Sequence, residues 1–342
     1  MKAWEIQSDT GIDALTLVDR QDPQPGYGEV LVRVRANSLN YRDLLMVRGA
    51  YGSAIELPRI PLSDGAGEVV EVGEGVSRFQ VGDRVAGIFF QDWISGELTR
   101  QSLQSALGGE RDGMLAEFVV LSQEGLVKLP EHLSYEEGAT LPCAAVTAWH
   151  ALQGIAPGDT VLLLGTGGVS IFALQFAQLH GARTIVTSSS DAKLDRAREL
   201  GATETINYKT TPDWEKRVYQ LTDRRGVDRI VEVGGAGTLA KSFKAVRVGG
   251  TISLIGVLAG AGGEVNPLPI IMKNLTVGGI YVGSREMFEA MNRAIALHQL
   301  CPVLDRVFPF SEAPDAYRYV ESAAHFGKVA ISGPASTSTS SR

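Results

Sequence analysis

A glycine-rich turn is the clearest candidate for chemistry in this chain. Residues 161–170 have the sequence Val-Leu-Leu-Leu-Gly-Thr-Gly-Gly-Val-Ser, so an apolar run leads into glycines and then into a segment with helical spacing. Glycines let a strand turn sharply and approach a pyrophosphate, and free N–H groups at a helix start favour an anion. The pattern predicts a dinucleotide site. Its expected cofactor contacts are Gly165, Thr166, Gly167, Gly168 and Val169.

The same turn departs from the dinucleotide pattern at one position. Ser170 replaces the last glycine of G-x-G-x-x-G. A glycine-rich turn without a ligand is therefore the alternative interpretation. The next segment favours the ligand, because residues 183–188 have the composition of a second buried strand and residues 191–200 that of a helix ended by Gly201.

The end of that second strand indicates which cofactor to expect. A site for NADH places a carboxylate there, about 20 residues after the glycines, to bind the ribose 2′-hydroxyl. This chain has Ser188, Ser189 and Ser190 instead, followed by Lys193. Hydroxyl and ammonium groups can bind a 2′-phosphate that a carboxylate would repel. We therefore expect NADPH, with NADH less favoured, and helix capping is the alternative role of Ser189 and Ser190.

The composition limits the class of protein. The 342 residues carry a net charge of −7, with 21% charged and 44% hydrophobic residues. This length suits two domains of roughly 150 residues each. The acidic balance argues against nucleic acid as a partner. No apolar run is long enough for a membrane span, and the N-terminus lacks the apolar core of a signal peptide. We expect a cytoplasmic protein with a small-molecule substrate.

Two kinds of pattern divide the chain. Residues 1–130 carry short alternating strands between glycines, prolines and aspartates, which predicts a β-rich, barrel-like module. Residues 131–284 alternate strands and helices, which predicts an α/β fold with a doubly wound parallel sheet. Residues 285–333 end in a strand that we expect to return to the first module. The polar tail, 334–342, predicts disorder.

The motifs, in this order, resemble the medium-chain dehydrogenase/reductase superfamily. The resemblance rests on residues 65–73, 81–85, 141–149 and 164–169 and extends from Met1 to about Gly333. Within the superfamily the chain is most similar to the quinone oxidoreductase branch, which lacks zinc and includes reductases of enals and enones. The resemblance implies a Rossmann-type sheet, a GroES-like catalytic domain and, by analogy, a homodimer.

The resemblance also places the catalytic zinc ligands of other members on this chain. They fall on Asn40, Ser63 and Cys143, and only the cysteine is an ordinary zinc ligand. Residues 89–113, where those members carry a structural zinc, contain no cysteine. We therefore expect no zinc. A metal held by Cys143 with Asp43 and Asp64 is the less favoured alternative, and Cys143 as a small core residue is the simpler one.

By the same resemblance, Asn40 and Tyr51 are the expected catalytic residues. Either could donate a hydrogen bond to the substrate oxygen. The alternatives are that Asn40 satisfies backbone groups in a turn and that Tyr51 is packing. Arg42 and Arg48 are weaker candidates for the same cleft.

The expected cofactor contacts outside the glycine turn come from several segments. The resemblance places Thr147 on one face of the nicotinamide, Lys193 and Tyr208 at the 2′-phosphate, and Ser284 and Arg285 near the nicotinamide end, with helix capping as their alternative. Gly234 and Gly256 follow predicted strands, at the edge where open parallel sheets bind ligands, although they could simply form turns.

Three functions are compatible with these patterns. The favoured one is an NADPH-dependent oxidoreductase that transfers hydride to a quinone or α,β-unsaturated carbonyl without zinc, because such acceptors need positioning and hydrogen bonds to a developing oxyanion. An alcohol dehydrogenase with an altered or absent metal site is the second. An NADPH-binding protein with little turnover is the third. The aromatic residues Phe89, Phe90 and Trp93 suggest an apolar or aromatic substrate, with anchoring of their loop as the alternative.

Overall fold

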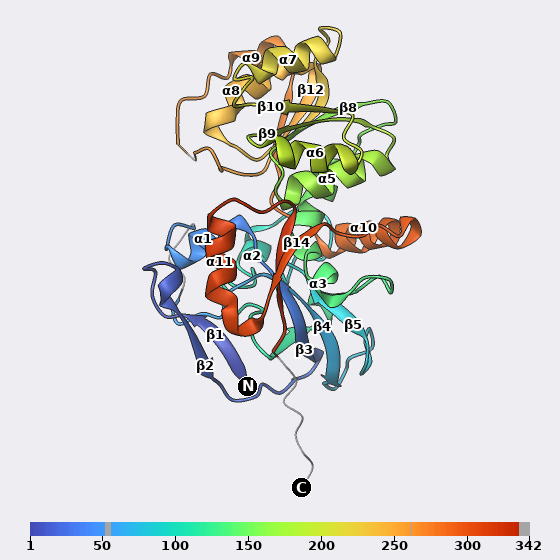
Figure 1. The fold of residues 1–342 in the computed structure, drawn as a ribbon. Coiled ribbons are helices and arrows are strands. Elements are labelled where there is room, and N and C mark those ends of the chain that lie inside the picture. The colour runs from blue at the N-terminus through green and yellow to red at the C-terminus, as the bar shows by residue number, and fades with distance from the viewer. Residues whose placement is uncertain (52–55, 261, 335–342) are drawn as a thin grey trace. The chain divides into compact units, whose positions relative to one another are not determined.

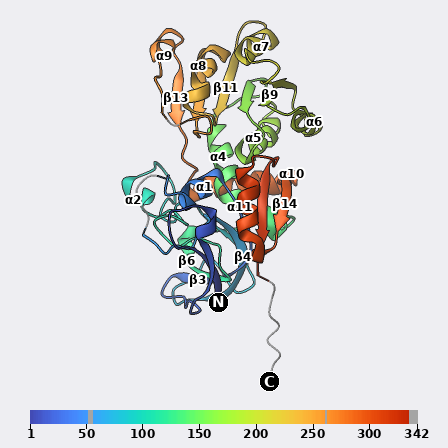
Figure 2. The same ribbon diagram turned by 60° about the vertical axis from the view of Figure 1, so that its left-hand side comes forward.

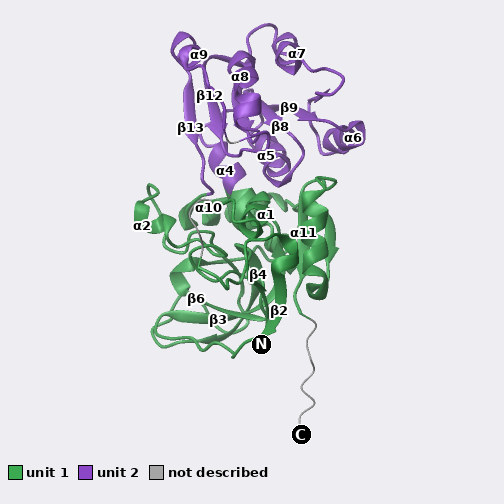
Figure 3. Cartoon of the chain, turned by 90° about the vertical axis from the view of Figure 1, so that its left-hand side faces the viewer, with its two compact units in different colours: residues 1–146, 283–342 green, residues 147–282 purple. Residues whose placement is uncertain are grey.

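The structure of the chain is a computed structural model that describes residues 1–51, 56–260 and 262–334, and it separates the chain into two compact units. Unit 1 contains residues 1–146 and 283–342, and unit 2 contains residues 147–282 (Figure 3). The predicted disordered tail lies, from residue 335 onward, outside the described residues.

Unit 2 is built on a parallel sheet whose strand order is β10-β9-β8-β11-β12-β13. The strands are β8 (Thr160–Leu164), β9 (Arg183–Ser188), β10 (Glu204–Asn207), β11 (Val227–Glu232), β12 (Val246–Leu254) and β13 (Thr276–Gly279). The helices are α4 (Val146–Ala151), α5 (Gly168–Leu179), α6 (Asp191–Glu199), α7 (Trp214–Leu221), α8 (Ala236–Ala245) and α9 (Leu268–Met272) (Figure 1). The predicted doubly wound α/β sheet is confirmed.

Local sequence explains why these elements form. Residues of β8 are buried on both faces, as expected for a central parallel strand, and Leu162 lies in register with Ile185 and Ile230 on either side. Helix α5 ends where Gly181 adopts a φ of 70°, a left-handed conformation that favours glycine. Helix α6 begins at Ser190, whose hydroxyl accepts a hydrogen bond from the Lys193 N–H. Capping, one of the roles considered for this serine run, is therefore present at Ser190.

Unit 1 is built on a mainly antiparallel sheet of order β14-β15-β3-β4-β5-β7, in which β6 also pairs with β3, together with a separate β1-β2 pair. The strands are β1 (Lys2–Ile6), β2 (Leu15–Asp19), β3 (Glu29–Ser38), β4 (Asp64–Val72), β5 (Arg84–Gly87), β6 (Phe118–Ser122), β7 (Leu126–Lys128), β14 (Leu304–Phe308) and β15 (Lys328–Ser332). The helices are η1 (Ile12–Ala14), α1 (Tyr41–Val47), α2 (Arg100–Leu103), η2 (Gln123–Gly125), α3 (Tyr135–Gly138), η3 (Leu141–Ala145), α10 (Arg285–His298), η4 (Phe310–Glu312) and α11 (Ala313–Glu321).

The last strand of the chain completes this sheet. Strand β15 lies antiparallel to β3, with Ala330 opposite Ser38 and Ile331 opposite Asn37. Unit 1 is therefore discontinuous in sequence, and Asn40 lies between the end of β3 at Ser38 and the start of α1 at Tyr41. The same register brings Lys328 opposite Asn40, just beyond the paired residues.

The borders of the two units differ from the sequence-based division. That division assigned residues 131–146, together with residues 283 and 284, to the dinucleotide-binding part. The structure groups them with unit 1, because α3 packs on β3 and β4, and η3 packs on β4 and β5. Sequence patterns mark where strands and helices alternate, whereas the border is set by the sheet on which each short helix packs.

Candidate functional site

The glycine turn of unit 2 has the geometry of an anion cradle. Gly165 adopts a φ of 79°, and side chains placed on Gly165 or Gly167 would meet no atom within 4 Å. Gly167 precedes α5 without a capping side chain. Ser170, which replaces the third glycine, is turned inward, and its hydroxyl donates to the Leu164 carbonyl at 2.7 Å. The open space and the uncapped helix start fit the pyrophosphate of a dinucleotide.

A buried carboxylate shapes the neighbouring turn, and the sequence analysis missed it. Glu232, at the end of β11, is fully buried, and its Oε1 accepts from the Gly234 N–H at 2.8 Å and from the Gly235 N–H at 3.2 Å. The hydroxyls of Thr238 and Ser242 also donate to this carboxylate. A glutamate that ends an apolar strand before two glycines was the signal in the sequence.

Gly234 and Gly256 are both required by close packing inside unit 2. A Cβ at Gly234 would lie 2.3 Å from Oγ1 of Thr238, and one at Gly256 would lie 2.6 Å from the Val233 carbonyl oxygen. Turn formation, the simpler interpretation of these glycines, thus has a concrete cause. Their contact with a cofactor stays a prediction, as does that of Thr147, a buried residue of α4.

The predicted 2′-phosphate contacts lie on adjacent strands. Ser188 ends β9 and is paired in register with Asn207 of β10, so the Tyr208 N–H that follows donates to the Ser188 carbonyl at 3.0 Å. Tyr208 is exposed. The nearest carboxylate in sequence, Asp191, accepts from the Asn207 amide at 2.8 Å. The end of β9 therefore presents Ser188 and Ser189 where an NADH site would present an acid.

In unit 1, a buried ion pair stands beside the predicted catalytic asparagine. Lys328 is 3% exposed, and its Nζ donates to the Leu39 carbonyl and to the Asn40 Oδ1, both at 2.6 Å. The same Nζ lies 3.5 Å from Oδ2 of Asp64, which is fully buried. Lys328 was missed by the sequence analysis, although a lysine at the start of an otherwise apolar returning strand was its signal.

The residues at the zinc positions do not fit a zinc ion. The Asn40 amide oxygen accepts from Lys328, and the Ser63 hydroxyl donates to Oδ1 of Asp64 at 2.9 Å. Burial, with the nearby charge of Asp64, raises the pKa of the Cys143 thiol. Among the described residues, no group of three His, Cys, Asp or Glu side chains is arranged to hold a metal.

One oxygen of Asp43, a ligand in the alternative metal site, is engaged at the start of its own helix. Its Oδ2 accepts from the Asn40 N–H at 2.7 Å. Burial, partly offset by Arg42, raises the pKa of Asp43 to about 6. This carboxylate fixes the start of α1 and so positions Asn40.

Tyr51 and Arg42 form part of a packed aromatic group. The Arg42 guanidinium lies 5.0 Å from the Tyr51 ring centroid and 4.6 Å from that of Phe89, and it donates to the Leu107 carbonyl at 2.9 Å. Phe89, Phe90 and Trp93 are all buried. Anchoring, the alternative role of these aromatics, is thus what they do in unit 1. The weaker candidate Arg48 is ion-paired with Glu321.

Ser284 and Arg285 serve the start of α10. The Ser284 hydroxyl accepts from the Met287 N–H at 3.3 Å, and the Arg285 guanidinium pairs with Glu124. Helix capping, the alternative considered for this pair, is therefore present. Both residues are grouped with unit 1 rather than with the parallel sheet, and contact with the nicotinamide stays a prediction.

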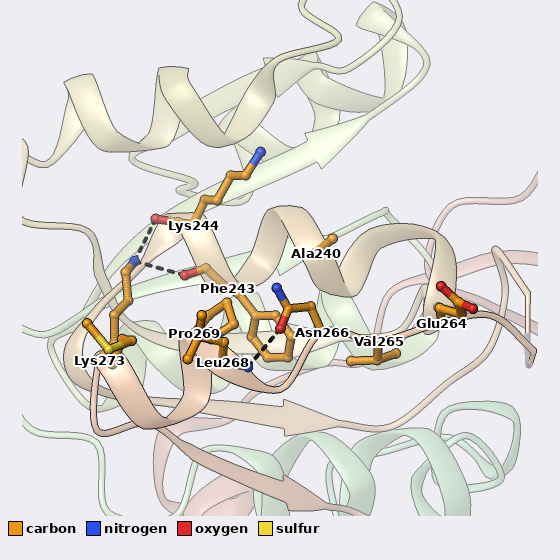
Figure 4. Close-up of a pocket in the computed structure, with 11 residues that line it drawn as sticks. Ala240, Phe243, Lys244, Glu264, Val265, Asn266, Leu268, Pro269 and Lys273 are labelled. Atoms are coloured by element: carbon orange, nitrogen blue, oxygen red, sulfur yellow. Dashed lines mark hydrogen bonds between the residues drawn. The ribbon is translucent and has the colours of Figure 1, made fainter.

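An apolar pocket lies in unit 2 between α8 and α9. None of its described lining residues belongs to the glycine turn. Phe243, Val265, Leu268 and Pro269 contribute to its lining (Figure 4). The Lys273 ammonium closes one end, since it donates to the carbonyls of Phe243, Lys244 and Val246 at the C-terminus of α8. A lysine at this position stabilises the helix end.

Comparison with known proteins relates the chain to dehydrogenases. The family model for the alcohol dehydrogenase GroES-like domain matches residues 26–131, and the one for zinc-binding dehydrogenases matches residues 168–297. A zinc-type alcohol dehydrogenase-like protein of Schizosaccharomyces pombe is 47% identical, over 94% of this chain and 96% of its own.

Solved structures share the whole architecture. An NAD-dependent alcohol dehydrogenase superposes with a TM-score of 0.89 at 35% identity, covering 97% of this chain and 99% of that one. The quinone oxidoreductase of Pseudomonas syringae superposes with a TM-score of 0.82 at 28% identity, again over 97% and 99%. Within the described part of the chain, no helix combines the length and apolarity needed to cross a membrane.

Proposed function

Because this chain belongs to the medium-chain dehydrogenase/reductase superfamily of oxidoreductases, whose members bind NAD(P)H, we propose that it is a zinc-independent, NADPH-dependent reductase of quinones or α,β-unsaturated carbonyls. The observation that carries the proposal is the donor set at the zinc positions. Asn40 and Ser63 are both engaged in internal hydrogen bonds, which supports a reaction that does not use a Lewis acid at these positions.

Unit 2 would bind the cofactor through two features. Gly165 and Gly167 leave open space for the pyrophosphate beside the start of α5. Ser188, Ser189 and Lys193 supply hydroxyl and ammonium groups for a 2′-phosphate. When bound, NADPH supplies the hydride.

Unit 1 would bind the carbonyl oxygen of the acceptor. Hydride addition to the β-carbon of an enone, or to a quinone, moves negative charge onto oxygen, and a hydrogen-bond donor stabilises it there. We assign this donation to Asn40, assisted by the Tyr51 hydroxyl. Solvent then protonates the α-carbon of the enolate or the oxygen of the reduced quinone, so no strongly acidic side chain is required.

We also propose that the protein is a homodimer joined along the outer edge of unit 2. Strand β13 ends the sheet, and α9 next to it has no buried residue (Figure 2). Ile271 and Met272 are 75% and 73% exposed. In a two-fold dimer the same surface of each chain contacts its counterpart on the other. An apolar helix beside an open strand edge is suited to such a contact, because both copies are covered together.

An alcohol dehydrogenase is the second candidate, favoured by the similarity to proteins of that name. The test offers an ortho-quinone, an enal and a series of primary alcohols separately, with NADPH or NADP⁺, and follows the cofactor's absorbance. Turnover of the quinone or enal with slow alcohol oxidation supports the proposal. Faster oxidation of an alcohol supports the second candidate. Tight NADPH binding without turnover of any substrate would instead indicate a binding protein.

A further inference from the structure

Lys328 determines the orientation of the Asn40 amide. The two groups meet at 2.6 Å between Nζ and Oδ1. An ammonium carries three N–H donors and no acceptor, so only the oxygen of an amide can face it. The NH₂ group of Asn40 must therefore point to the opposite side, and this assignment does not depend on distinguishing oxygen from nitrogen by position alone.

The amide nitrogen set in this way is left without a partner. Asn40 Nδ2 is buried and makes no hydrogen bond among the described residues. A buried donor without an acceptor has lost its hydration without gaining a partner, so it calls for an explanation. Asn40 as a residue is half-buried but Nδ2 itself is covered, so an acceptor oxygen reaches it only once neighbouring atoms move aside. An oxygen that accepts from Nδ2 would supply that partner.

Neighbouring groups balance the charge of the Lys328 ammonium. The Lys328 Nζ has three acceptors around it, the Leu39 carbonyl, the Asn40 Oδ1 and the Asp64 carboxylate. Asp64 is held in turn by the hydroxyls of Ser38, at 3.0 Å, and Ser63. The lysine is fixed from three directions, and a positive charge on the oxygen side of an amide makes its N–H groups stronger donors.

We propose that Lys328 is a positioning residue of the reductase: it grips the Asn40 amide by its oxygen and so presents the polarised Nδ2 hydrogens to the oxyanion of the acceptor. The inference rests on the proposed function, in which Asn40 is the catalytic donor. No covalent step involves Lys328.

The test is a double-mutant cycle on kcat for NADPH-dependent reduction of an enal. Asn40→Ala should lower kcat by about 100-fold or more, the usual effect of removing an oxyanion donor. Lys328→Met should lower kcat by about tenfold or more with a smaller change in KM, because the donor acts on developing charge. In the Asn40→Ala background, the lysine substitution should cause no further loss.

Matched variants separate positioning from folding. Lys328→Met leaves Asp64 buried and unpaired, so the same cycle is repeated in an Asp64→Asn background, which removes that charge. Lys273→Met, which deletes a half-buried ammonium that donates to three carbonyls in unit 2, should leave kcat within about twofold. NADPH affinity, followed by cofactor fluorescence, should be unchanged in every Lys328 variant.

The outcomes distinguish this inference from the function it rests on. Absence of turnover in wild-type protein that binds NADPH refutes the proposed function. Normal wild-type turnover with multiplicative losses in the cycle, or with an unchanged kcat in Lys328→Met, refutes only the positioning role. Lys328→Met is tested alone and in the Asp64→Asn background. If neither protein folds while Lys273→Met does, Lys328 is structural and the proposal is overturned.

Discussion

Asp228 fixes the amino-terminal edge of the sheet in unit 2, and its removal has a calculable effect. Its carboxylate accepts from the Thr160 N–H at 2.8 Å, twice from the Arg225 guanidinium, and from Nε of Arg247 at 2.6 Å. Burial acts to raise the pKa of Asp228, but these hydrogen bonds outweigh it and lower the pKa from 3.8 to about 2. That difference corresponds to about 2 kcal/mol of stability at neutral pH.

The pH dependence of this stability has a defined sign. Since the folded-state pKa is depressed, the contribution is complete above about pH 5 and is lost as the pH falls, with about half of it gone by pH 3. Asp228→Asn should therefore lower the free energy of unfolding by about 2–3 kcal/mol at pH 7, and the gap to wild type should narrow toward pH 3.

Chemical denaturation at several pH values measures both quantities. Asp228 lies near the start of β11, whereas the glycine turn lies at the edge of the sheet where the parallel strands end. The NADPH affinity of the folded variant should therefore match that of wild type. A gap that is constant with pH would refute the argument that the hydrogen bonds act by lowering the pKa. A large loss of NADPH affinity would refute the separation of scaffold and site.

Three further substitutions test other parts of the account. Asp43→Asn should remove a pH dependence: burial raises the pKa of Asp43 to about 6, so wild-type unfolding free energy should fall by about 2 kcal/mol from pH 4 to pH 7 relative to the variant. Lys193→Ala should weaken NADPH by about tenfold or more but leave NADH affinity nearly unchanged, and equal losses would remove Lys193 from the 2′-phosphate site. Ile271→Lys should convert a dimer into a monomer in sedimentation velocity, while Tyr219→Lys, on an exposed part of α7, should not; a monomeric wild type would contradict the dimer.

Much of unit 2 could be predicted because its signals are local. The apolar run of β8, the glycines after it and Gly181 at the end of α5 each have a single low-energy structure. The lengths of the strands were less predictable, since β13 ends at Gly279, where its pairing with β12 stops. Pairing depends on neighbours that periodicity does not reveal.

The candidate site was only partly predictable, for a physical reason. Asn40 was identified from its position, but the group that orients it, Lys328, is 288 residues away and arrives through the pairing of β15 with β3. Likewise, the aromatic residues at 89, 90 and 93 looked available for a substrate, whereas the Arg42 guanidinium and the unit 1 core take them up. Long-range contacts decide which polar or aromatic side chains remain available.

The most direct test of the central claim compares zinc content with reductase activity. Elemental analysis and kcat for the favoured acceptor, quinone or enal, are measured on the same protein before and after exhaustive chelation, and again after zinc is added back. For a zinc-independent reductase, kcat should be the same in all three samples and independent of the zinc-to-protein ratio. Loss of activity on chelation and its recovery with one zinc per chain would contradict it.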